Sequence, residues 1–387
     1  MSRPRIVFVA PYAWAALAGE GARGAFDYVG GAEMQKARLA RVLAARGHDV
    51  WMITADFGQP RRVEIDGITI ERAYRPYEGV PGLRFFHPRG SGVIAALERV
   101  RPDIVYQRTA GGLTGQCALW ARARGRRFVF ACAHDFDTLP ASPFLSNPRD
   151  RWLYRWGLRH ADVVLAQSTL QQESLRVSHG IEAQLVKNVI TIPPVPRPEP
   201  EVARVLWLGT VKEDKRPRWM LKAARALPEV RFVIAGGPPP PPMSDQHHRE
   251  LRAEIEGLSN VALTGFVAPA RVPDLMAGAT LFAHTSGAEG FPNTLLEAWA
   301  SGVPSVSVVD PDQAVSVFGA GVRVDDEDEF IEAIRGLMYD PDRRRALGTT
   351  ARAYVLEHHS PDAVARSFER ALGLEAPEAN ARATGAA

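Results

Sequence analysis

One strand–loop–helix segment, residues 279–304, constrains the fold of this chain more than any other stretch. The apolar run 279–283 is typical of a buried strand, and the small, glycine-rich residues of 286–291 follow it as a loop. Pro292 suits the first turn of a helix, which we expect to end at Gly302. A buried strand that feeds a helix through a short loop is the building unit of an α/β sheet.

The start of this predicted helix has the properties of an anion site. Asn293 or Thr294 can help to cap the first turn, and the unpaired N–H groups of a helix N-terminus attract phosphate. Glu289 in the loop and Glu297 in the helix flank the site. A carboxylate beside a diphosphate is repelled unless it faces hydroxyl groups instead. The expected ligand is therefore a phosphate compound that also carries sugars.

Length and composition narrow the class of protein. A chain of 387 residues fits two domains, and its net charge of +3 is too small to imply nucleic-acid binding. Cys117 and Cys132 both lie in apolar surroundings, so we expect buried free thiols. A strand begins near Ile6, which leaves no room for a signal peptide, and no apolar run approaches the ~20 residues of a membrane span. We expect a cytoplasmic protein, at most peripheral to the inner membrane.

The first half of the chain opens with a strand–helix–strand unit. The apolar run 6–10 predicts a central parallel strand, and the helix that opens at Gly30-Gly31 leads to the next strand at 50–54. The long segment 12–29 between the first strand and the helix reads as a loop at the carboxyl end of a strand, where open α/β sheets bind ligands. Further strands are expected at 68–73, 104–106, 128–132 and 161–168, and helices at 93–100 and 111–124.

The segment 149–159 mixes arginines with Trp152, Tyr154 and Trp156. Such an amphipathic helix either contacts a membrane surface or covers a sheet. Both interpretations stay open at this point.

The second half begins after the proline-rich stretch 191–200, which predicts a domain linker. The acidic pair Asp310 and Asp312 and the segment 325–329 read as turns or helix starts, so we expect no metal site. Strands are expected at 203–208, 230–235 and 260–264, a helix after 325–329 and a final helix at 360–372.

The run E-G-F-P-N-T-L-L-E-A-W-A-S-G-V-P, with seven residues between Glu289 and Glu297, closely resembles the signature of the retaining glycosyltransferases of family GT4. The segments 30–33 and 209–217 also resemble that family. The resemblance implies the GT-B fold, in which two Rossmann-like domains face each other across a cleft and a C-terminal helix crosses back to the first domain. The domains would be an acceptor-binding domain at 1–190, a linker at 191–201, a nucleotide-sugar-binding domain at 202–359, a crossover helix at 360–374 and a tail at 375–387.

The resemblance also implies roles for individual residues. Catalytic roles fall to Glu289, His134 and Lys215. The implied acceptor-binding residues are Gly30, Gly31, Glu33, His134 and Asp135. The implied donor-binding residues are Thr210, Lys212, Lys215, Gly236, Gly237, Val267, Glu289, Gly290, Phe291, Pro292, Asn293, Thr294, Leu295 and Glu297.

The chain departs from the family pattern at two places. Thr210 stands where the family commonly has an arginine that binds the diphosphate, and Lys212 is a candidate replacement for the missing charge. The segment 310–313 stands where a glycine-rich loop is typical.

The implied reaction is transfer of a sugar from a UDP- or GDP-linked donor to an acceptor, with retention of anomeric configuration and without a metal or other cofactor. The acceptor would be a glycan, a lipid-linked saccharide or a small molecule, and the protein a monomer or homodimer without a nucleic-acid partner. A nucleotide-sugar epimerase, a sugar phosphorylase and a non-catalytic sugar-nucleotide binder are the alternatives.

Overall fold

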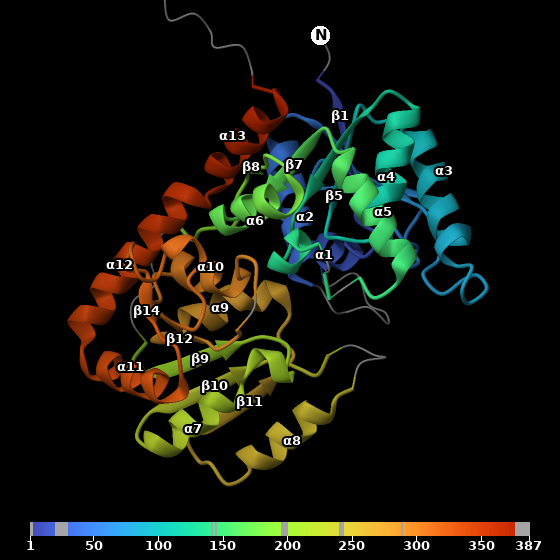
Figure 1. Cartoon of the computed structure of the whole chain (residues 1–387). Coiled ribbons are helices and arrows are strands. Elements are labelled where there is room, and N and C mark those ends of the chain that lie inside the picture. Colours follow the sequence, from blue (N-terminus) through green and yellow to red (C-terminus); the bar gives the residue numbers. More distant parts are fainter. Residues whose placement is uncertain are drawn as a thin grey trace, which may run out of the picture.

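The computed structural model describes residues 3–19, 30–140, 142–143, 145–194, 200–239, 244–287 and 289–375. Its strands form two separate sheets, one above the other in Figure 1, with helices packed on the faces of each. Within the described residues, the strands of each sheet are parallel to their neighbours, except that β3 is antiparallel to β4. The predicted α/β architecture of two Rossmann-like units is confirmed.

The first sheet has the strand order β3-β4-β2-β1-β5-β6-β7-β8. Its central strands β1 and β5 are buried along almost their whole length, which explains why the sequence shows continuous apolar runs there. Phe8 of β1 lies between Met52 of β2 and Tyr106 of β5 in the strand register. The strands are β1 (Arg5–Val9), β2 (Asp49–Thr54), β3 (Arg62–Ile65), β4 (Ile68–Arg72), β5 (Ile104–Arg108), β6 (Arg127–Ala131), β7 (Val163–Ala166) and β8 (Gln184–Leu185).

Helices cover both faces of this first sheet. One face packs against α2 (Gly31–Ala45), and the other packs against α3 (Ser91–Val100), α4 (Gly112–Ala123) and α5 (Pro148–Arg159). The segment 12–29, predicted as a loop, contains the short helix α1 (Trp14–Ala18), and its residues 20–29 lie outside the described residues. The remaining helical elements of this half are α6 (Thr169–His179) and the short segments η2 (Phe85–Gly90) and η3 (Asp135–Thr138).

The second sheet has the strand order β11-β10-β9-β12-β13-β14. One of its faces packs against α9, α10 and α12, and the other against α7 and α11. The strands are β9 (Arg204–Leu208), β10 (Arg231–Ala235), β11 (Val261–Gly265), β12 (Leu281–His284), β13 (Ser305–Ser307) and β14 (Gly321–Arg323). The helices are α7 (Arg218–Ala226), α8 (Gln246–Ile255), α9 (Val272–Ala277), α10 (Asn293–Ala300), α11 (Glu327–Tyr339) and α12 (Pro341–His358), with short 3₁₀ turns η4 (Glu213–Lys215), η5 (Pro269–Arg271) and η6 (Pro311–Gln313).

Acidic residues after β14 start two helices, of which the first was predicted from segment 325–329. Asp326 accepts a hydrogen bond from the Glu329 N–H at 2.9 Å and so caps α11. Asp340 accepts from the Arg343 N–H at 2.9 Å and caps α12, a helix that the sequence analysis did not predict.

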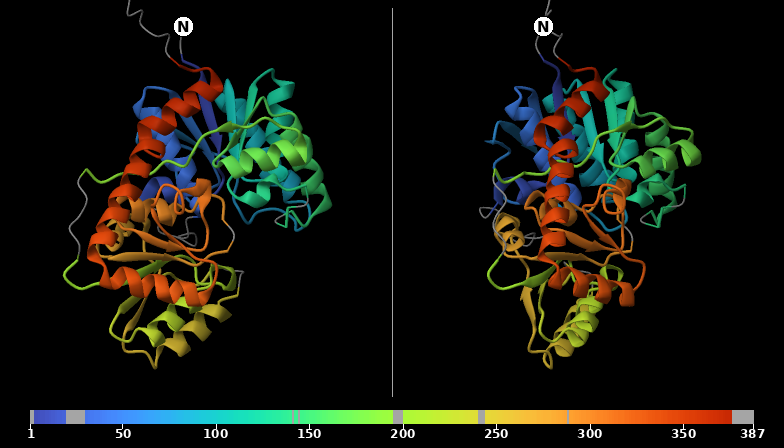
Figure 2. Two further views of the ribbon diagram at one scale, coloured as in Figure 1. Left: turned by 60° about the vertical axis from the view of Figure 1, so that its left-hand side comes forward. Right: turned by 90° about the vertical axis from the view of Figure 1, so that its left-hand side faces the viewer.

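The last described helix, α13 (Pro361–Leu372), crosses back to the first sheet. Val364 and Phe368 are buried in the core that α2 and β1 form, and Glu369 accepts from the Arg46 guanidinium at 2.9 Å. Figure 2 shows α12 and α13 running in succession along one side of the molecule, from the second sheet to the first. The predicted crossover of the C-terminal helix is confirmed.

The interval between the two sheets runs from Leu185, the end of β8, to Arg204, the start of β9. The predicted linker 191–201 lies in this interval, with residues 195–199 outside the described ranges, and the predicted tail is described only at Glu375. The domain boundaries themselves stay predictions.

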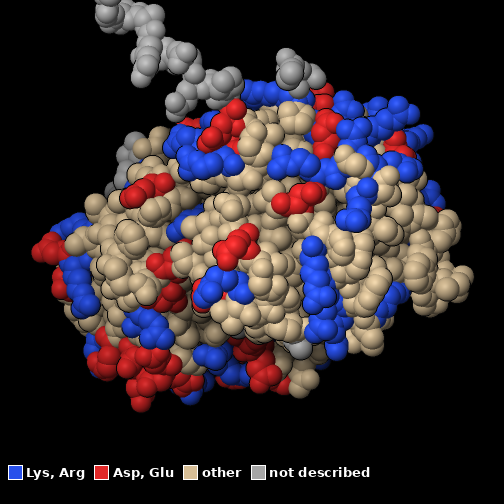
Figure 3. Space-filling view, turned by 45° about the horizontal axis from the view of Figure 1, so that its top comes forward, with Lys and Arg blue, Asp and Glu red and all other residues tan. Residues whose placement is uncertain are grey.

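Three further observations concern the cysteines, the hydropathy of the helices and the surface charge. Both Cys117 and Cys132 are free and buried, as expected. None of the helices in the described ranges has both the length and the hydropathy that a transmembrane helix needs. Among the described residues on the face shown in Figure 3, acidic and basic side chains are interspersed.

Candidate functional site

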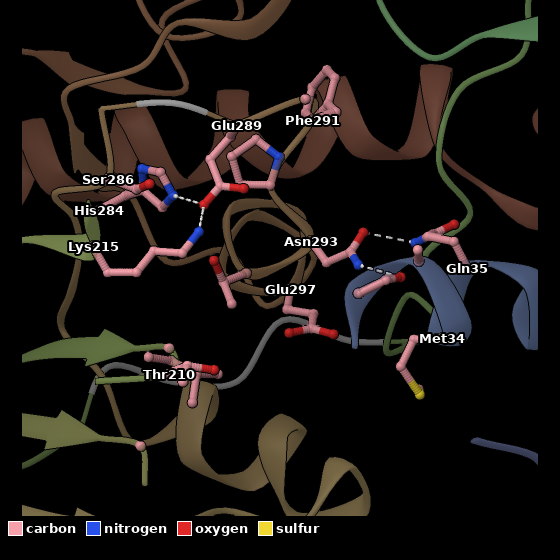
Figure 4. A pocket seen from close by; sticks show the side chains of 18 of the residues that line it. Met34, Gln35, Thr210, Lys215, His284, Ser286, Glu289, Phe291, Asn293 and Glu297 are labelled. Atoms are coloured by element: carbon pink, nitrogen blue, oxygen red, sulfur yellow. Dashed lines mark hydrogen bonds and ion pairs between the residues drawn. The ribbon is translucent and has the colours of Figure 1, made fainter. Parts of the chain in front are cut away.

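A cavity of about 470 Å³ lies between the two sheets, where strand ends and loops of both meet (Figure 4). The first sheet contributes the start of α2, Arg108 at the end of β5 and His134 after β6. The second sheet contributes the ends of β9, β10 and β12 and the start of α10. Ligand sites of open parallel sheets lie beyond the carboxyl ends of the strands, and this cavity has that location on both sheets.

The start of α10 faces this cavity. Gly290 to Thr294 all contribute to the lining, whereas Leu295, Leu296 and Trp299 are fully buried and anchor the helix in the second core. The N-cap residue is Pro292, and within the described part of the chain no side-chain hydrogen bond caps the helix. The predicted capping role of Asn293 or Thr294 is therefore wrong. An uncapped first turn keeps its N–H groups available for an anion.

Asn293 instead connects the second sheet to the first. Its Oδ1 accepts from Gln35 Nε2 at 2.9 Å, and its Nδ2 donates to the carbonyl of Gly31 at 3.1 Å (Figure 4). A Cβ atom at Gly31 would lie 2.9 Å from Asn293 Nδ2, so a larger residue there would have to displace the Asn293 amide. Asn188 adds a second connection, because its Nδ2 donates to the carbonyl of Phe291 at 3.0 Å. The start of α10 is thus held from the opposite sheet.

Glu289 and Lys215 form an ion pair at the edge of this cavity (Figure 4). His284 Nε2 lies 3.9 Å from the same carboxylate oxygen, and Ser286 also contributes a hydrogen bond. Burial alone would raise the pKa of Glu289, but the Lys215 ammonium and His284 outweigh it and lower that pKa below its ordinary value. Burial lowers the pKa of His284 to about 4. At neutral pH the site therefore holds an ionised Glu289 beside a neutral His284.

Glu297 lines the same cavity as Glu289, on the first turns of α10. Its Oε1 accepts from Arg38 Nη2 at 2.6 Å, and Arg38 belongs to α2 of the first sheet. Among the described residues no hydrogen bond involves the other oxygen, Oε2, which leaves that atom available for a hydroxyl group. The sequence analysis did not anticipate Arg38.

His134 is held in one orientation by the turn that it begins. Its Nδ1 accepts from the Phe136 N–H at 3.1 Å, so the proton of the neutral ring is assigned to Nε2. The Asp137 carboxylate fixes the backbone of this turn, because it accepts from the backbone N–H groups of Ala133 and His134 at 2.7 and 3.1 Å. The Asp135 carboxylate accepts from Gln171 Nε2 at 2.9 Å and is not part of the cavity lining. That Asp135 orients the ring or contacts the acceptor stays a prediction.

Other predicted donor residues divide into two groups. Thr210, Gly236, Gly237 and Val267 line the cavity. Lys212 does not; its ammonium lies 3.0 Å from the Asp214 carboxylate. Leu295, Gly30 and Glu33 also lie outside the lining, and Glu33 pairs with Lys36 at 3.3 Å.

The segment 310–313, the second departure from the family pattern, also connects the two sheets. Asp312 Oδ1 accepts from the N–H and the hydroxyl of Thr169 at 2.7 and 2.8 Å. Its other oxygen lies 2.9 Å from Lys187 Nζ. Asp312 and Gln313 adopt positive φ values of 52° and 57°, so this contact is made by a tightly turned backbone.

Several lining residues were missed by sequence reasoning. Three of them share one signal, a polar side chain at or just after the carboxyl end of a predicted strand. That signal would have found Arg108 at the end of β5, Gln167 after β7 and His284 at the end of β12. Met34, Gln35 and Asn188 carry no such signal, since their approach to the cavity depends on how the two sheets pack.

Comparisons with known proteins cover most of the chain. A family model described as glycosyl transferases group 1 matches residues 202–340, and one described as glycosyltransferase family 4 matches residues 29–195. A D-inositol 3-phosphate glycosyltransferase of Mycobacterium avium is 31% identical over 179 residues, which are 43% of this chain and 42% of that protein. The match therefore spans less than half of that relative. A 2-deoxystreptamine N-acetyl-D-glucosaminyltransferase of Streptomyces fradiae is 26% identical over 321 residues, 72% of this chain and 74% of that protein.

Solved structures share the fold. HepE of Anabaena, solved in complex with UDP and glucose, superposes with a TM-score of 0.75 at 18% identity, covering 96% of this chain and 100% of that one. Sucrose-phosphate synthase of Thermosynechococcus elongatus also has a TM-score of 0.75, at 19% identity, covering 96% of this chain and 98% of that one. At such identities the likeness concerns the fold alone.

Proposed function

Because this chain belongs to the group 1 glycosyltransferases of family 4 and has their GT-B fold, we propose that it transfers a sugar from a nucleotide-diphosphate sugar to an acceptor, with retention at the anomeric carbon. One observation carries the proposal. The start of α10, the Glu289–Lys215 pair and Glu297 all line one cavity between the two sheets.

The donor would bind mainly to the second sheet. Its diphosphate suits the uncapped first turn of α10 together with Lys215, whose ammonium can donate to a phosphate while it stays paired with Glu289. The second oxygen of Glu297 would accept from a ribose hydroxyl. Gly237 and Val267 line the part of the cavity where backbone groups would bind the nucleobase.

The chemistry requires the bond between sugar and phosphate to break, so negative charge grows on the diphosphate. The α10 amides and Lys215 are positioned to stabilise that charge before the reaction begins, which makes a metal ion unnecessary in this proposal. The ionised Glu289 would bind sugar hydroxyls and favour the positive charge that develops on the sugar ring. His134 would donate from Nε2 to the transferred sugar or to the acceptor.

The substrates are proposed from the relatives. HepE was solved with UDP-glucose, so we propose a UDP-linked hexose as the donor to test first. The names of two relatives mention D-inositol 3-phosphate and 2-deoxystreptamine, which are both small hydroxylated rings. A small polyol is therefore the first acceptor class to test, before glycans and lipid-linked saccharides.

We propose a cytoplasmic location, with at most peripheral contact between α5 and a membrane. Of the three aromatic residues of α5, Tyr154 is buried and Trp156 stacks on His160 at 4.2 Å between ring centroids, so the helix mainly covers the sheet. Only Trp152 is exposed, at 63%, and any contact with a membrane would be peripheral and centred there. The proposed location is the cytoplasm.

The proposal is tested in two steps. The thermal unfolding midpoint is first measured with UDP, GDP and ADP, and we expect UDP to raise it. UDP-hexoses are then incubated with polyol acceptors, and the anomeric configuration of the product is determined by NMR. Absence of a shift with all three nucleotides would contradict the donor site.

The second step also separates the alternatives. Conversion of the donor without an acceptor would identify an epimerase, and a requirement for free phosphate would identify a phosphorylase. Binding without transfer or hydrolysis would leave a non-catalytic binder.

A further inference from the structure

Arg108 is a buried cation in the cavity lining for which the roles above give no use. It ends β5, is 7% exposed and lines the cavity. Its Nη2 donates to Gln167 Oε1 and to Asn188 Oδ1, each at 2.8 Å. Both of these partners are neutral amides, and the Tyr106 hydroxyl is a further uncharged partner of the guanidinium. In the described part of the chain, the buried Nε has no hydrogen-bond partner. Among the described residues, no carboxylate lies within ion-pair distance of this guanidinium. Glu33 on neighbouring α2 forms its ion pair with Lys36 at 3.3 Å, and the more distant Arg108 charge also helps to lower the pKa of Glu33.

A buried guanidinium whose hydrogen-bond partners are all neutral is unfavourable, because it has given up hydration without gaining a direct ion pair. Such an arrangement is explained if the opposite charge arrives with a ligand. The unpartnered Nε is a second indication, since a buried donor without an acceptor also costs free energy. Arg108 lines the cavity between the sheets, and the other space that it borders, of about 10 Å³, is too small for a ligand.

The amide side chains of Gln167 and Asn188, both bonded to Arg108 Nη2, lie between Arg108 and the start of α10. Asn188, bonded to Arg108 through Oδ1, donates through Nδ2 to the carbonyl of Phe291 at 3.0 Å. Gln167 lies against Gly290 so closely that a Cβ there would be 2.1 Å from Gln167 Nε2. The Asn188 side chain thus lies between the guanidinium and Phe291, and the Gln167 side chain lies between the guanidinium and Gly290. Both Phe291 and Gly290 belong to the expected diphosphate site.

Among the described residues of the lining, the second sheet supplies one cationic side chain, that of Lys215. The guanidinium of Arg216 lies next to Gly287 of the loop that carries Glu289, but Arg216 is exposed and outside the lining. Thr210 replaces the expected arginine, and Lys212 is paired with Asp214 outside the cavity lining. Lys215 shares its charge with Glu289. Arg108 and Lys215 are the lysine and arginine side chains among the described residues of the lining, and only Arg108 lacks a carboxylate partner.

We propose that Arg108 supplies, from the first sheet, the second positive charge that the donor's diphosphate needs, and so compensates for Thr210. The inference rests on the proposed function, since it assumes a nucleotide-diphosphate donor. It makes diphosphate binding depend on both sheets, because the cation and the helix start belong to opposite sides of the cavity.

The test compares Arg108→Gln, which removes the charge, with Arg108→Lys, which keeps it. The matched control is Arg344→Gln. Arg344 is also buried, and it donates to the carbonyls of Leu337 and Met338 away from the cavity. Binding is measured by calorimetry with whichever of UDP, GDP and ADP binds the unmodified protein, and with the corresponding nucleoside.

We expect Arg108→Gln to weaken binding of the nucleoside diphosphate by about 10- to 100-fold, as loss of one nearby charge predicts, and binding of the nucleoside by less than about twofold. Arg108→Lys should stay within about fivefold and Arg344→Gln within about twofold. Added salt should weaken diphosphate binding less in Arg108→Gln than in the unmodified protein.

Several outcomes would overturn the inference. Unchanged diphosphate affinity in Arg108→Gln would do so, and an accompanying rise in the acceptor KM would assign the charge to an anionic acceptor. Equal losses for nucleoside and diphosphate would show a purely structural role. Should Arg108→Gln fail to fold, Arg108→Lys decides, because a loss above about 30-fold despite the retained charge contradicts the proposal. If the unmodified protein binds none of the three nucleotides, the proposed function fails as well.

Discussion

The two glutamates of the α10 segment sit in contrasting surroundings. Glu289 is paired with Lys215, and both belong to loops of the second sheet, whereas Glu297 is paired with Arg38 of the first sheet. The Glu289 half of the site is therefore complete within one folding unit. The Glu297 half exists only when the two sheets pack together. We expect chemistry to depend on the first pair, and donor affinity and domain closure to depend on the second.

The largest effect is expected for Glu289→Ala. Removing a carboxylate that is ionised at neutral pH beside the reacting sugar should lower kcat by roughly 10³-fold, as for other preorganised electrostatic groups. Steady-state kinetics with saturating donor measures it, and an unchanged thermal unfolding midpoint shows that the fold is intact. Equal activity of the variant and the unmodified protein would remove Glu289 from the reaction.

Lys215→Ala should lower kcat by roughly 10²-fold, because it removes charge from the leaving diphosphate. It should also change the pH profile. Lys215 lowers the pKa of Glu289, so its loss raises that pKa, and the acid limb of kcat against pH should move to higher pH. An acid limb at the same pH in both proteins would show that Glu289 does not control it.

Buried histidines should make stability fall in acid. Burial lowers the pKa of His284 to about 4 and that of His359 to about 3, both below the unfolded value. The unfolded chain therefore binds protons first, and stability present above pH 6.5 is lost as the pH falls towards 4, by about 1.4 kcal/mol per pH unit for each histidine.

Urea unfolding midpoints between pH 4.5 and 7 measure this loss. His359 lies away from the Glu289 pair, so His359→Asn tests this effect without changing that pair. The variant should reduce the slope of unfolding free energy against pH by an amount that corresponds to about one proton. A slope identical to that of the unmodified protein would contradict the assignment.

The smallest effect is expected for Arg38→Ala, because both partners of this pair are partly solvated, at 16% and 17% side-chain exposure. Loss of the contact across the two sheets should raise the donor KM about three- to tenfold and leave kcat within about twofold. Arg38→Lys should restore part of the affinity. A fall in kcat as large as that of Lys215→Ala would show that both halves of the site serve the same step.

The sequence predicted those features that depend on local pattern. The strand before α10, the buried face of that helix and the convergence of Glu289 and Lys215 near its start all follow from apolar runs, turn residues and the resemblance to one family. The 18-residue helix α12 was missed. The capping role of Asn293 was predicted wrongly, because a free amide side chain satisfies local capping rules while its actual partners, Gln35 and Gly31, lie more than 250 residues away in the chain.

By itself the sequence determined the class of fold, the helix start that suits a phosphate and the acids on either side of it, since these arise from residues close together in the chain. Only the tertiary structure decided which cation meets which carboxylate. Arg38 reaches Glu297, Asp312 reaches Thr169 and Lys187, and Arg108 comes to lie behind Phe291 without a carboxylate of its own. Each of these contacts joins one sheet to the other, and the packing of two separate cores sets that geometry, which no local pattern of residues records.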